Sequence, residues 1–222
     1  MASHRDGSRR RRRPVLVPVS LLVAAAGLAV AALLGGFAEA PPEPPETLGK
    51  GDTIDQVRIR TTFTDAVARR GGDDFGVSDK RYLLIHLNVT NLSDETVSAH
   101  SVVSASIPTV RADGKVIKGE ELDDLGPRIV INEQGRYLNQ IHPRLTRPVI
   151  MAFELPPDGT APQQVELDVA TFEWRESFFY ETHSWVVALD EIPGPGGDRT
   201  RTRYVPRVVA KVEMPVRVEG DL

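Results

Sequence analysis

The sequence contains no cysteine, and only 13 of its 222 residues are aromatic. Without cysteine the chain has no disulfide bond, no thiolate metal site, no thiol nucleophile and no lipid-modified cysteine. Any folded domain must therefore be held together by its own hydrophobic core, for which a chain of this length is sufficient.

Charge is absent from Pro14 to Ala38, a run of 25 residues in which Ser20 is the one polar side chain. Roughly 20 apolar residues span the 30 Å hydrocarbon core of a bilayer, because a helix rises about 1.5 Å per residue. A helix that is apolar on every face is seldom found on the surface of a soluble domain. We therefore expect a transmembrane helix over residues 14–38.

Five consecutive arginines, Arg9 to Arg13, precede this segment. Clustered positive charge resists translocation, so residues 1–13 are expected to form a basic cytoplasmic stub. Ala38-Glu39-Ala40 has the form of a signal-peptide cleavage site, which leaves a cleaved signal peptide as the alternative to a retained signal anchor. Pro41 fits a protease groove poorly, and the apolar run exceeds a usual signal peptide, so the retained anchor is favoured.

Residues 39–52 form a proline-rich linker with four prolines between Pro41 and Pro45, a composition that favours an extended spacer. The remaining residues 53–222 are expected to be one extracytoplasmic domain. The first 13 residues hold six arginines and one aspartate, which leaves 21 basic and 30 acidic residues and a net charge of −9. This acidic balance argues against a nucleic-acid partner.

The domain alternates polar and apolar residues with period two, most clearly over Arg81–Thr90. A turn at Asn91–Glu95 follows, and Thr96–Val103 resumes the alternation as a further strand. Asp113-Gly114 marks a tight hairpin. Other strands are expected at Ile54–Thr62, Arg128–Asn132, Pro148–Leu155, Val165–Phe172, Phe178–Leu189 and Tyr204–Val218. Many short strands without a long amphipathic helix predict an all-β sandwich or barrel.

Two segments resemble a known family. Tyr82–Val97 resembles the long strand, asparagine, polar turn and second strand of exported immunoglobulin-like domains of Gram-positive, including actinobacterial, envelopes, described as telokin-like or immunoprotective-antigen-like domains of unknown function. Leu138–Pro156 is similar to a second recurring segment, and the resemblance covers roughly residues 55–190. It implies an immunoglobulin-like β-sandwich at the cell surface without known catalysis. The chain departs from the family by lacking a lipobox and by longer loops near Arg70 and Gly194.

Patterns for catalysis or metal binding are weak. No two of the five histidines have helical metal spacing. His86 and His100 could meet across neighbouring strands and form a metal site, but a strand histidine that faces solvent is the favoured interpretation. Glu120–Asp124 offers carboxylates without the spacing and glycine of a calcium loop. The chain has no nucleophile elbow and no phosphate loop. We expect no catalytic residue, no cofactor and no bound metal. The histidines are His4, His86, His100, His142 and His183.

Aromatic residues gather between Phe172 and Trp185, a segment of 14 residues that holds six of the 13. One interpretation is core packing, and the other is an aromatic rim that docks a partner protein or a glycan. Phe178 and Phe179 are adjacent, so in a strand they point to opposite faces and cannot both enter one core. The candidate partner-binding residues are Trp174, Phe178, Phe179, Tyr180 and Trp185.

These features together predict a membrane-anchored extracytoplasmic binding or scaffolding protein that is not an enzyme. Its expected partners are the lipid bilayer, through residues 14–38, and an envelope protein or glycan. The alternative function, from a different class, is an accessory subunit of an envelope transporter or secretion complex, held by its transmembrane helix as much as by its domain.

Overall fold

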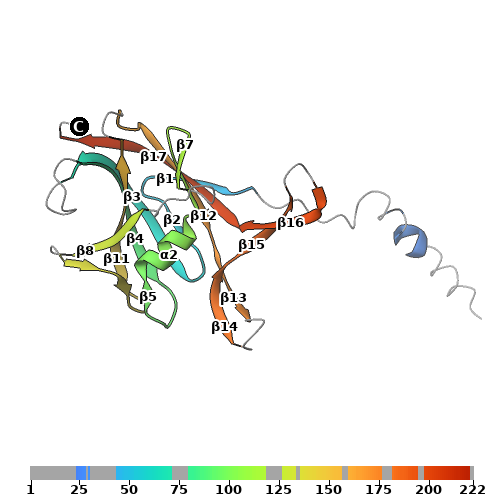
Figure 1. The fold of residues 1–222 in the computed structure, drawn as a ribbon. Helices are drawn as coiled ribbons and strands as arrows, with labels where there is room; N and C mark the ends of the chain where they lie inside the picture. The colour runs from blue at the N-terminus through green and yellow to red at the C-terminus, as the bar shows by residue number, and fades with distance from the viewer. Residues whose placement is uncertain are drawn as a thin grey trace, which may run out of the picture. The chain divides into compact units, whose positions relative to one another are not determined.

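The computed structural model describes residues 24–28, 30, 44–71, 80–118, 127–133, 136–156, 160–176, 182–194 and 198–220. The chain divides into two compact units, Met1–Glu43 and Pro44–Leu222. In the first unit, residues 24–28 and 30 are helical. In the second unit the described residues form β-strands and the short helix α2 (Figure 1).

The second unit has the following elements in chain order: β1 Glu46–Gly49, β2 Thr53–Asp55, β3 Ile59–Arg70, β4 Arg81–Asn91, β5 Val97–Ser98, α2 Ala99–Ser106, β6 Thr109–Ala112, β7 Lys115–Lys118, β8 Arg128–Glu133, β9 Arg136–Leu138, β10 Gln140–Ile141, β11 Thr146–Leu155, β12 Gln164–Ala170, β13 Phe172–Glu176, β14 His183–Val187, β15 Leu189–Gly194, β16 Asp198–Pro206 and β17 Val208–Glu219.

The expected membrane-spanning segment, residues 14–38, lies outside the described residues except for residues 24–28 and 30. Within the described part of the chain, no helix combines the length and the apolar character needed to cross a bilayer. The basic stub at residues 1–13 also lies outside the described residues. The membrane anchor therefore stays a prediction of the sequence.

The main sheet has the strand order β7-β6-β12-β17-β3-β4-β11-β8-β9, with β1 added to β17 and β2 added to β3. Strand β17 joins two halves of this sheet, one formed by β7, β6 and β12 and the other by β3, β4, β11, β8 and β9. Its residues 208–215 pair with β12, while residues 216–219 pair with β3 in parallel. Side chains from both halves build one core, among them Phe63 and Ile85 from one half and Leu167 and Val212 from the other. The halves therefore pack as a β-sandwich, which confirms the predicted all-β class.

Strand β4 confirms the strongest strand prediction of the sequence. Leu83, Ile85, Leu87 and Val89 face the core and are at most 1% exposed. On the opposite face Leu84 is also buried, where it packs with Ala152 of β11 in a second, smaller cluster. Both faces of β4 are thus partly covered, which departs from simple alternation between a buried and a solvated face.

The strand expected at Thr96–Val103 is wrong. Only Val97 and Ser98 form a strand, and residues 99–106 form helix α2. The Ser98 side chain caps this helix by accepting a hydrogen bond from the Ser101 N–H. The buried residues of the helix recur at helical spacing, which alternation alone misses. They are Ala99, Val102, Val103 and Ser106.

The hairpin predicted at Asp113-Gly114 is confirmed. Both residues have positive φ, 47° and 76°, as a two-residue turn between β6 and β7 requires. In contrast, Gly194 was expected in a long loop but ends β15 and pairs with Asp198 of β16. Arg70 ends β3, and residues 72–79 beyond it lie outside the described residues.

The domain boundary also needs a correction. Glu46–Gly49, which the sequence assigned to the proline-rich linker, is strand β1 and pairs in parallel with β17. Leu48 of this strand is 9% exposed and belongs to the core. Gly51, with φ 93°, makes the turn from β1 to β2. The folded unit therefore begins before residue 53, at Pro44.

Candidate functional site

Two β-ribbons extend from a common base in the sandwich, one formed by β13 and β14 and the other by β15 and β16 (Figure 1). Three backbone hydrogen bonds close a ring at this base. The N–H of Ala188 donates to Thr171 O at 2.9 Å, that of Arg207 to Ala188 O at 2.8 Å, and that of Thr171 to Arg207 O at 3.4 Å. The chain passes through this ring three times, at Thr171, Ala188 and Arg207. At each of these residues one strand ends and the next begins with a different pairing partner, so the ring marks the base of both ribbons.

The buried Gln56 fixes the start of β13. Its side-chain amide donates to Ala170 O at 2.7 Å, and its backbone carbonyl oxygen accepts from the Phe172 N–H at 3.2 Å. The Thr61 hydroxyl donates to the Gln56 side-chain oxygen at 2.7 Å. Because Gln56 is fully buried and its side chain is hydrogen-bonded through both the amide nitrogen and the oxygen, it holds Phe172, the first residue of β13, rigidly in place.

A ladder of aromatic rungs extends along one face of the β13–β14 ribbon. Phe172 pairs with Val187 and is buried in the core. Trp174 pairs with Trp185 one rung further out. These residues lie on one face because side chains of a strand alternate, so every second residue shares a face. The ladder therefore leads from the core to the surface.

The two indole rings of the second rung meet edge to face, with ring centroids 5.2 Å apart and an angle of 62° between the planes. This arrangement is among the favourable ones for aromatic pairs. Trp174 also stacks on His183, at 6.0 Å and 16°. Trp185 packs against the core, whereas Trp174 is 50% exposed. One face of the pair is thus open to a ligand.

The tryptophans border an open pocket of about 460 Å³, which we call the tryptophan pocket. Its other wall is the loop Leu92–Glu95, which follows β4. Asp94 and Glu95 bring two exposed carboxylates to the rim. Apolar rings and a few polar groups in a concave surface are the usual composition of a binding site.

Asn91 holds this loop in place. Its side-chain amide donates to Glu95 O at 2.7 Å and to Ile141 O at 2.9 Å. Its side-chain oxygen accepts from the backbone N–H and the hydroxyl of Ser93, at 3.0 and 2.7 Å. Asn91 is fully buried, so the loop is tied to the sandwich rather than to solvent. The rim carboxylates are therefore displayed from a rigid support.

Two arginines lie near the rim. Arg144 forms an ion pair with Asp94 at 2.9 Å, in which both side chains are well exposed. Arg58 lies over the Phe172 ring, with its guanidinium carbon 5.9 Å from the ring centroid. Burial lowers the pKa of Arg58, and the nearby Glu95 carboxylate opposes this effect. The first rung of the ladder thus already carries a cation beside an aromatic ring.

The structure brings together two of the five sequence-predicted binding residues, Trp174 and Trp185. The other three, Phe178, Phe179 and Tyr180, lie outside the described residues. Sequence reasoning missed the contribution of Leu92–Glu95 to the site. It identified this segment as a turn, but no local signal indicates that the turn lies against a ribbon about 80 residues later in the chain.

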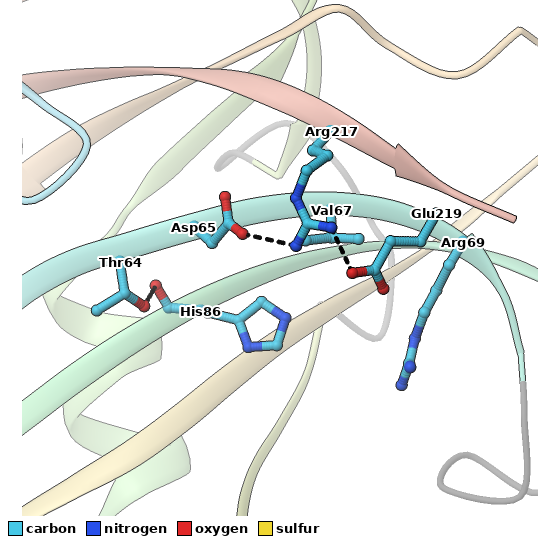
Figure 2. A pocket seen from close by; sticks show the side chains of 7 residues that line it. All are labelled: Thr64, Asp65, Val67, Arg69, His86, Arg217 and Glu219. Atoms are coloured by element: carbon cyan, nitrogen blue, oxygen red, sulfur yellow. Dashed lines mark hydrogen bonds and ion pairs between the residues drawn. The ribbon is translucent and has the colours of Figure 1, made fainter.

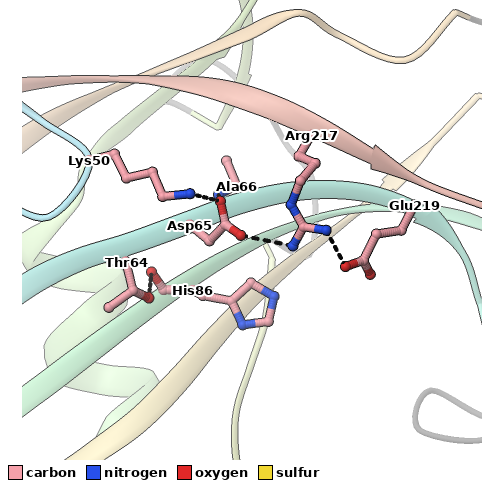
Figure 3. Close-up of polar contacts among 7 residues, drawn as sticks. All are labelled: Lys50, Thr64, Asp65, Ala66, His86, Arg217 and Glu219. Carbon is pink, nitrogen blue, oxygen red and sulfur yellow. Dashed lines mark hydrogen bonds and ion pairs between the residues drawn. The ribbon is translucent and has the colours of Figure 1, made fainter.

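A second pocket, of about 270 Å³, lies on the outer face of β3 and β4 beside the end of β17 (Figure 2). An irregularity in the pairing of β3 with β4 occurs at Thr64, whose hydroxyl donates to His86 O at 2.8 Å. Asp65 accepts from Lys50 at 2.8 Å and from Arg217 at 3.0 Å (Figure 3). Arg217 donates also to Glu219 at 2.5 Å. We call this set the outer-face pocket.

Electrostatics explains why the outer-face pocket is a weak candidate for acid–base chemistry. Burial alone would raise the pKa of Asp65, but hydrogen bonds from Lys50 and Arg217 outweigh it and hold the pKa below its usual value. Burial lowers the pKa of His86, while Asp65 opposes and Arg69 reinforces the change. The carboxylate is thus ionised and paired, and the imidazole is neutral at pH 7.

The histidines do not form a metal site among the described residues. His86 lies on β4, whereas His100 is exposed on α2, so the neighbouring-strand arrangement is wrong. Within the described ranges, no group of three or more histidine, aspartate and glutamate side chains is placed to hold a metal ion. The acidic segment Glu120–Asp124 lies outside the described residues.

Solved structures with a similar fold include two from Gram-positive bacteria. The chain is similar to a β-sandwich protein from Clostridium difficile 630, with a TM-score of 0.41 and 11% identity over 80% of this chain and 97% of that one. It is also similar to a candidate lipoprotein from Staphylococcus aureus, with a TM-score of 0.37 and 17% identity over 61% and 88%. No family model and no curated sequence matches. At these scores the likenesses assign neither a family nor a function.

Proposed function

We propose that the chain is a membrane-anchored extracytoplasmic binding protein whose immunoglobulin-like sandwich captures a partner at the tryptophan pocket, without catalysis. The observation that carries the proposal is the Trp174–Trp185 pair, which has one ring half exposed beside an open pocket. Tryptophan dominates binding energy at protein interfaces because it buries a large apolar area and retains a polar N–H.

The support around the pair also favours binding. The ribbon is fixed at its base by the backbone ring at Thr171, Ala188 and Arg207, and the loop wall is fixed by Asn91. A rigid site loses less conformational freedom when a partner binds, which improves affinity. The acidic domain and the arginine-flanked apolar segment at residues 14–38 support the location outside the membrane.

Site-specific photocrosslinking of the full-length chain in its membrane tests this proposal. A photoreactive phenylalanine analogue replaces Trp174, which is 50% exposed, in one variant and Val116 of β7, which is 41% exposed, in the control. We expect a discrete cross-linked partner, protein or glycan, from position 174 and none from position 116. Identical patterns from the two positions, or no adduct at 174, would reject binding at the tryptophan pocket.

The alternative, an accessory subunit of an envelope transporter or secretion complex, is favoured by one observation. The apolar segment is rich in small residues, including Ala24-Ala25-Ala26-Gly27, which allow close packing between membrane helices. Capture experiments with and without residues 1–40 separate the two functions. A partner that requires residues 1–40 but tolerates a change at Trp174 supports the alternative.

A further inference from the structure

We propose that the tryptophan pocket binds an arginine side chain of a partner polypeptide, with the guanidinium against Trp174 and hydrogen-bonded to the rim carboxylates Asp94 and Glu95. This inference rests on the proposed function and specifies the chemistry that the pocket recognises. It is carried by the composition of the pocket and by an intramolecular contact one rung away.

The composition of the pocket favours a cation. Among the described residues that line it are two indole rings and two carboxylates, and none of these lining residues is basic. Ring faces attract cations through their quadrupole, and carboxylates attract them directly. A neutral ligand would use the rings but would leave both carboxylates unpaired by the ligand.

An intramolecular contact on the same ribbon favours a guanidinium as that cation. Arg58 lies over Phe172, the inner rung of the same ladder, and Glu95 is the carboxylate close enough to affect it. Glu95 also lines the pocket at the next rung outward. The domain therefore already places a guanidinium against an aromatic ring of this ladder. The tryptophan pocket offers a further aromatic ring together with the Glu95 carboxylate, and none of its lining residues is a cation.

Arginine suits the site better than lysine. Its planar guanidinium stacks on an aromatic face and donates to a carboxylate at the same time, whereas a lysine ammonium is a strongly hydrated point charge. The ion pair between Arg144 and Asp94 does not block this role, because both side chains are well exposed and solvent weakens their attraction. The net charge of −9 after residue 13 attracts a basic partner at longer range.

Intrinsic fluorescence offers a direct test, because the chain has only two tryptophans and both border the pocket. The full-length protein in detergent is titrated with arginine blocked at both termini, and separately with blocked citrulline, which has nearly the same shape but no charge. We expect a saturable change with arginine and about tenfold weaker binding of citrulline, equivalent to about 1.4 kcal/mol.

A matched pair of variants locates the effect. Glu95→Gln removes one rim charge while keeping the backbone carbonyl that Asn91 binds, and we expect it to weaken arginine binding about tenfold. The control is Glu154→Gln on β11, which lies opposite Tyr82 in the strand register and thus at the other end of β4. It also removes one charge and should leave arginine binding unchanged.

Three outcomes overturn the inference. Equal responses to arginine and citrulline would show that charge is not recognised, and no response to arginine would show that the pocket does not take it. A saturable response to a dimer of N-acetylglucosamine alone would replace arginine with a glycan, and the proposed binding function would survive. Failure of all probes together with no cross-link at position 174 would reject the proposed function as well.

Discussion

At the scale of single residues, the tryptophan pocket depends on Asn91, a buried side chain that does not itself line the pocket. Every hydrogen-bonding atom of its amide has a partner, and these partners lie in two segments, Ser93–Glu95 and Ile141. The sequence placed Asn91 in a turn but could not show that it joins two distant segments. That role depends on the approach of residues 141–145 to the end of β4, where the Asn91 N–H also donates to Leu145 O at 3.1 Å, and such a long-range contact has no local signal.

Replacing Asn91 tests its role. Asn91→Ala leaves the carbonyl oxygens of Glu95 and Ile141 without this donor, and each unsatisfied buried group costs about 1–3 kcal/mol. We expect the free energy of unfolding in urea to fall by about 2–5 kcal/mol. Asn88→Ala, at an exposed site on the same strand, is the control and should change it by less than about 0.5 kcal/mol. Similar losses in both variants would contradict the anchoring role of Asn91.

Lys118 is a second residue for which we predict an effect, here on how stability depends on pH. Burial lowers its pKa to about 8, while its ammonium donates to the carbonyl oxygens of Ser104, at 2.7 Å, and Ile107. The unfolded chain has the ordinary lysine pKa of about 10.5. Between pH 8 and 10.5 the unfolded chain therefore binds more protons than the folded one, so stability rises with pH across this window and is lost as pH falls through it.

The comparison of wild type with Lys118→Met isolates this residue, because methionine keeps a long apolar side chain without charge. The free energy of unfolding should rise more steeply with pH in the wild type, by an amount on the order of 3 kcal/mol between pH 8 and 10.5. Urea titrations at several pH values measure it. If the difference in free energy of unfolding between the two proteins stays constant with pH, burial does not destabilise the charged form of Lys118.

At the scale of elements, the sequence predicted those whose signal is local. Strand β4 alternates over its whole length, and the Asp113-Gly114 turn carries its own φ requirement. Helix α2 was missed because Val97 to Val103 satisfies alternation and a helical face equally well over so few residues. The ribbon pairing of Trp174 with Trp185 was missed because residues 178–189 were interpreted as one strand, whereas β14 begins at His183.

Strand β1 provides a test at this scale. A protein of residues 44–222 retains β1, whereas residues 53–222 lack it and leave part of the edge of β17 unpaired. Loss of the buried Leu48 and of the β1 ladder should lower the free energy of unfolding by about 2–5 kcal/mol.

Leu48→Ala within residues 44–222 is the control that separates side-chain burial from backbone pairing. It should cause a part of the loss but leave the two-state transition intact. Chemical unfolding of the three proteins measures the effect. Equal stability of the two lengths would show that residues 44–52 act as linker, as the sequence indicated.

At the scale of the whole molecule, the distribution of charge is the strongest feature. The net charge is +5 over residues 1–13 and −9 over residues 39–222, and the uncharged residues 14–38 lie between these parts. If residues 14–38 span the bilayer, this asymmetry places the tryptophan pocket outside the cell membrane, where an envelope partner can reach it. The orientation of the chain across the membrane is the part of the proposed function that rests on the sequence alone.

The absence of native cysteine makes this orientation directly measurable, since any introduced cysteine is unique. Val116→Cys lies at an exposed site of β7, and Ser8→Cys lies in the basic stub. In intact spheroplasts a membrane-impermeant maleimide should label position 116 and not position 8, because the arginine block resists translocation. Permeabilised spheroplasts are the control, in which both positions should react. Labelling of position 8 alone would reverse the topology, and release of labelled domain into the medium would show that the segment is a cleaved signal peptide.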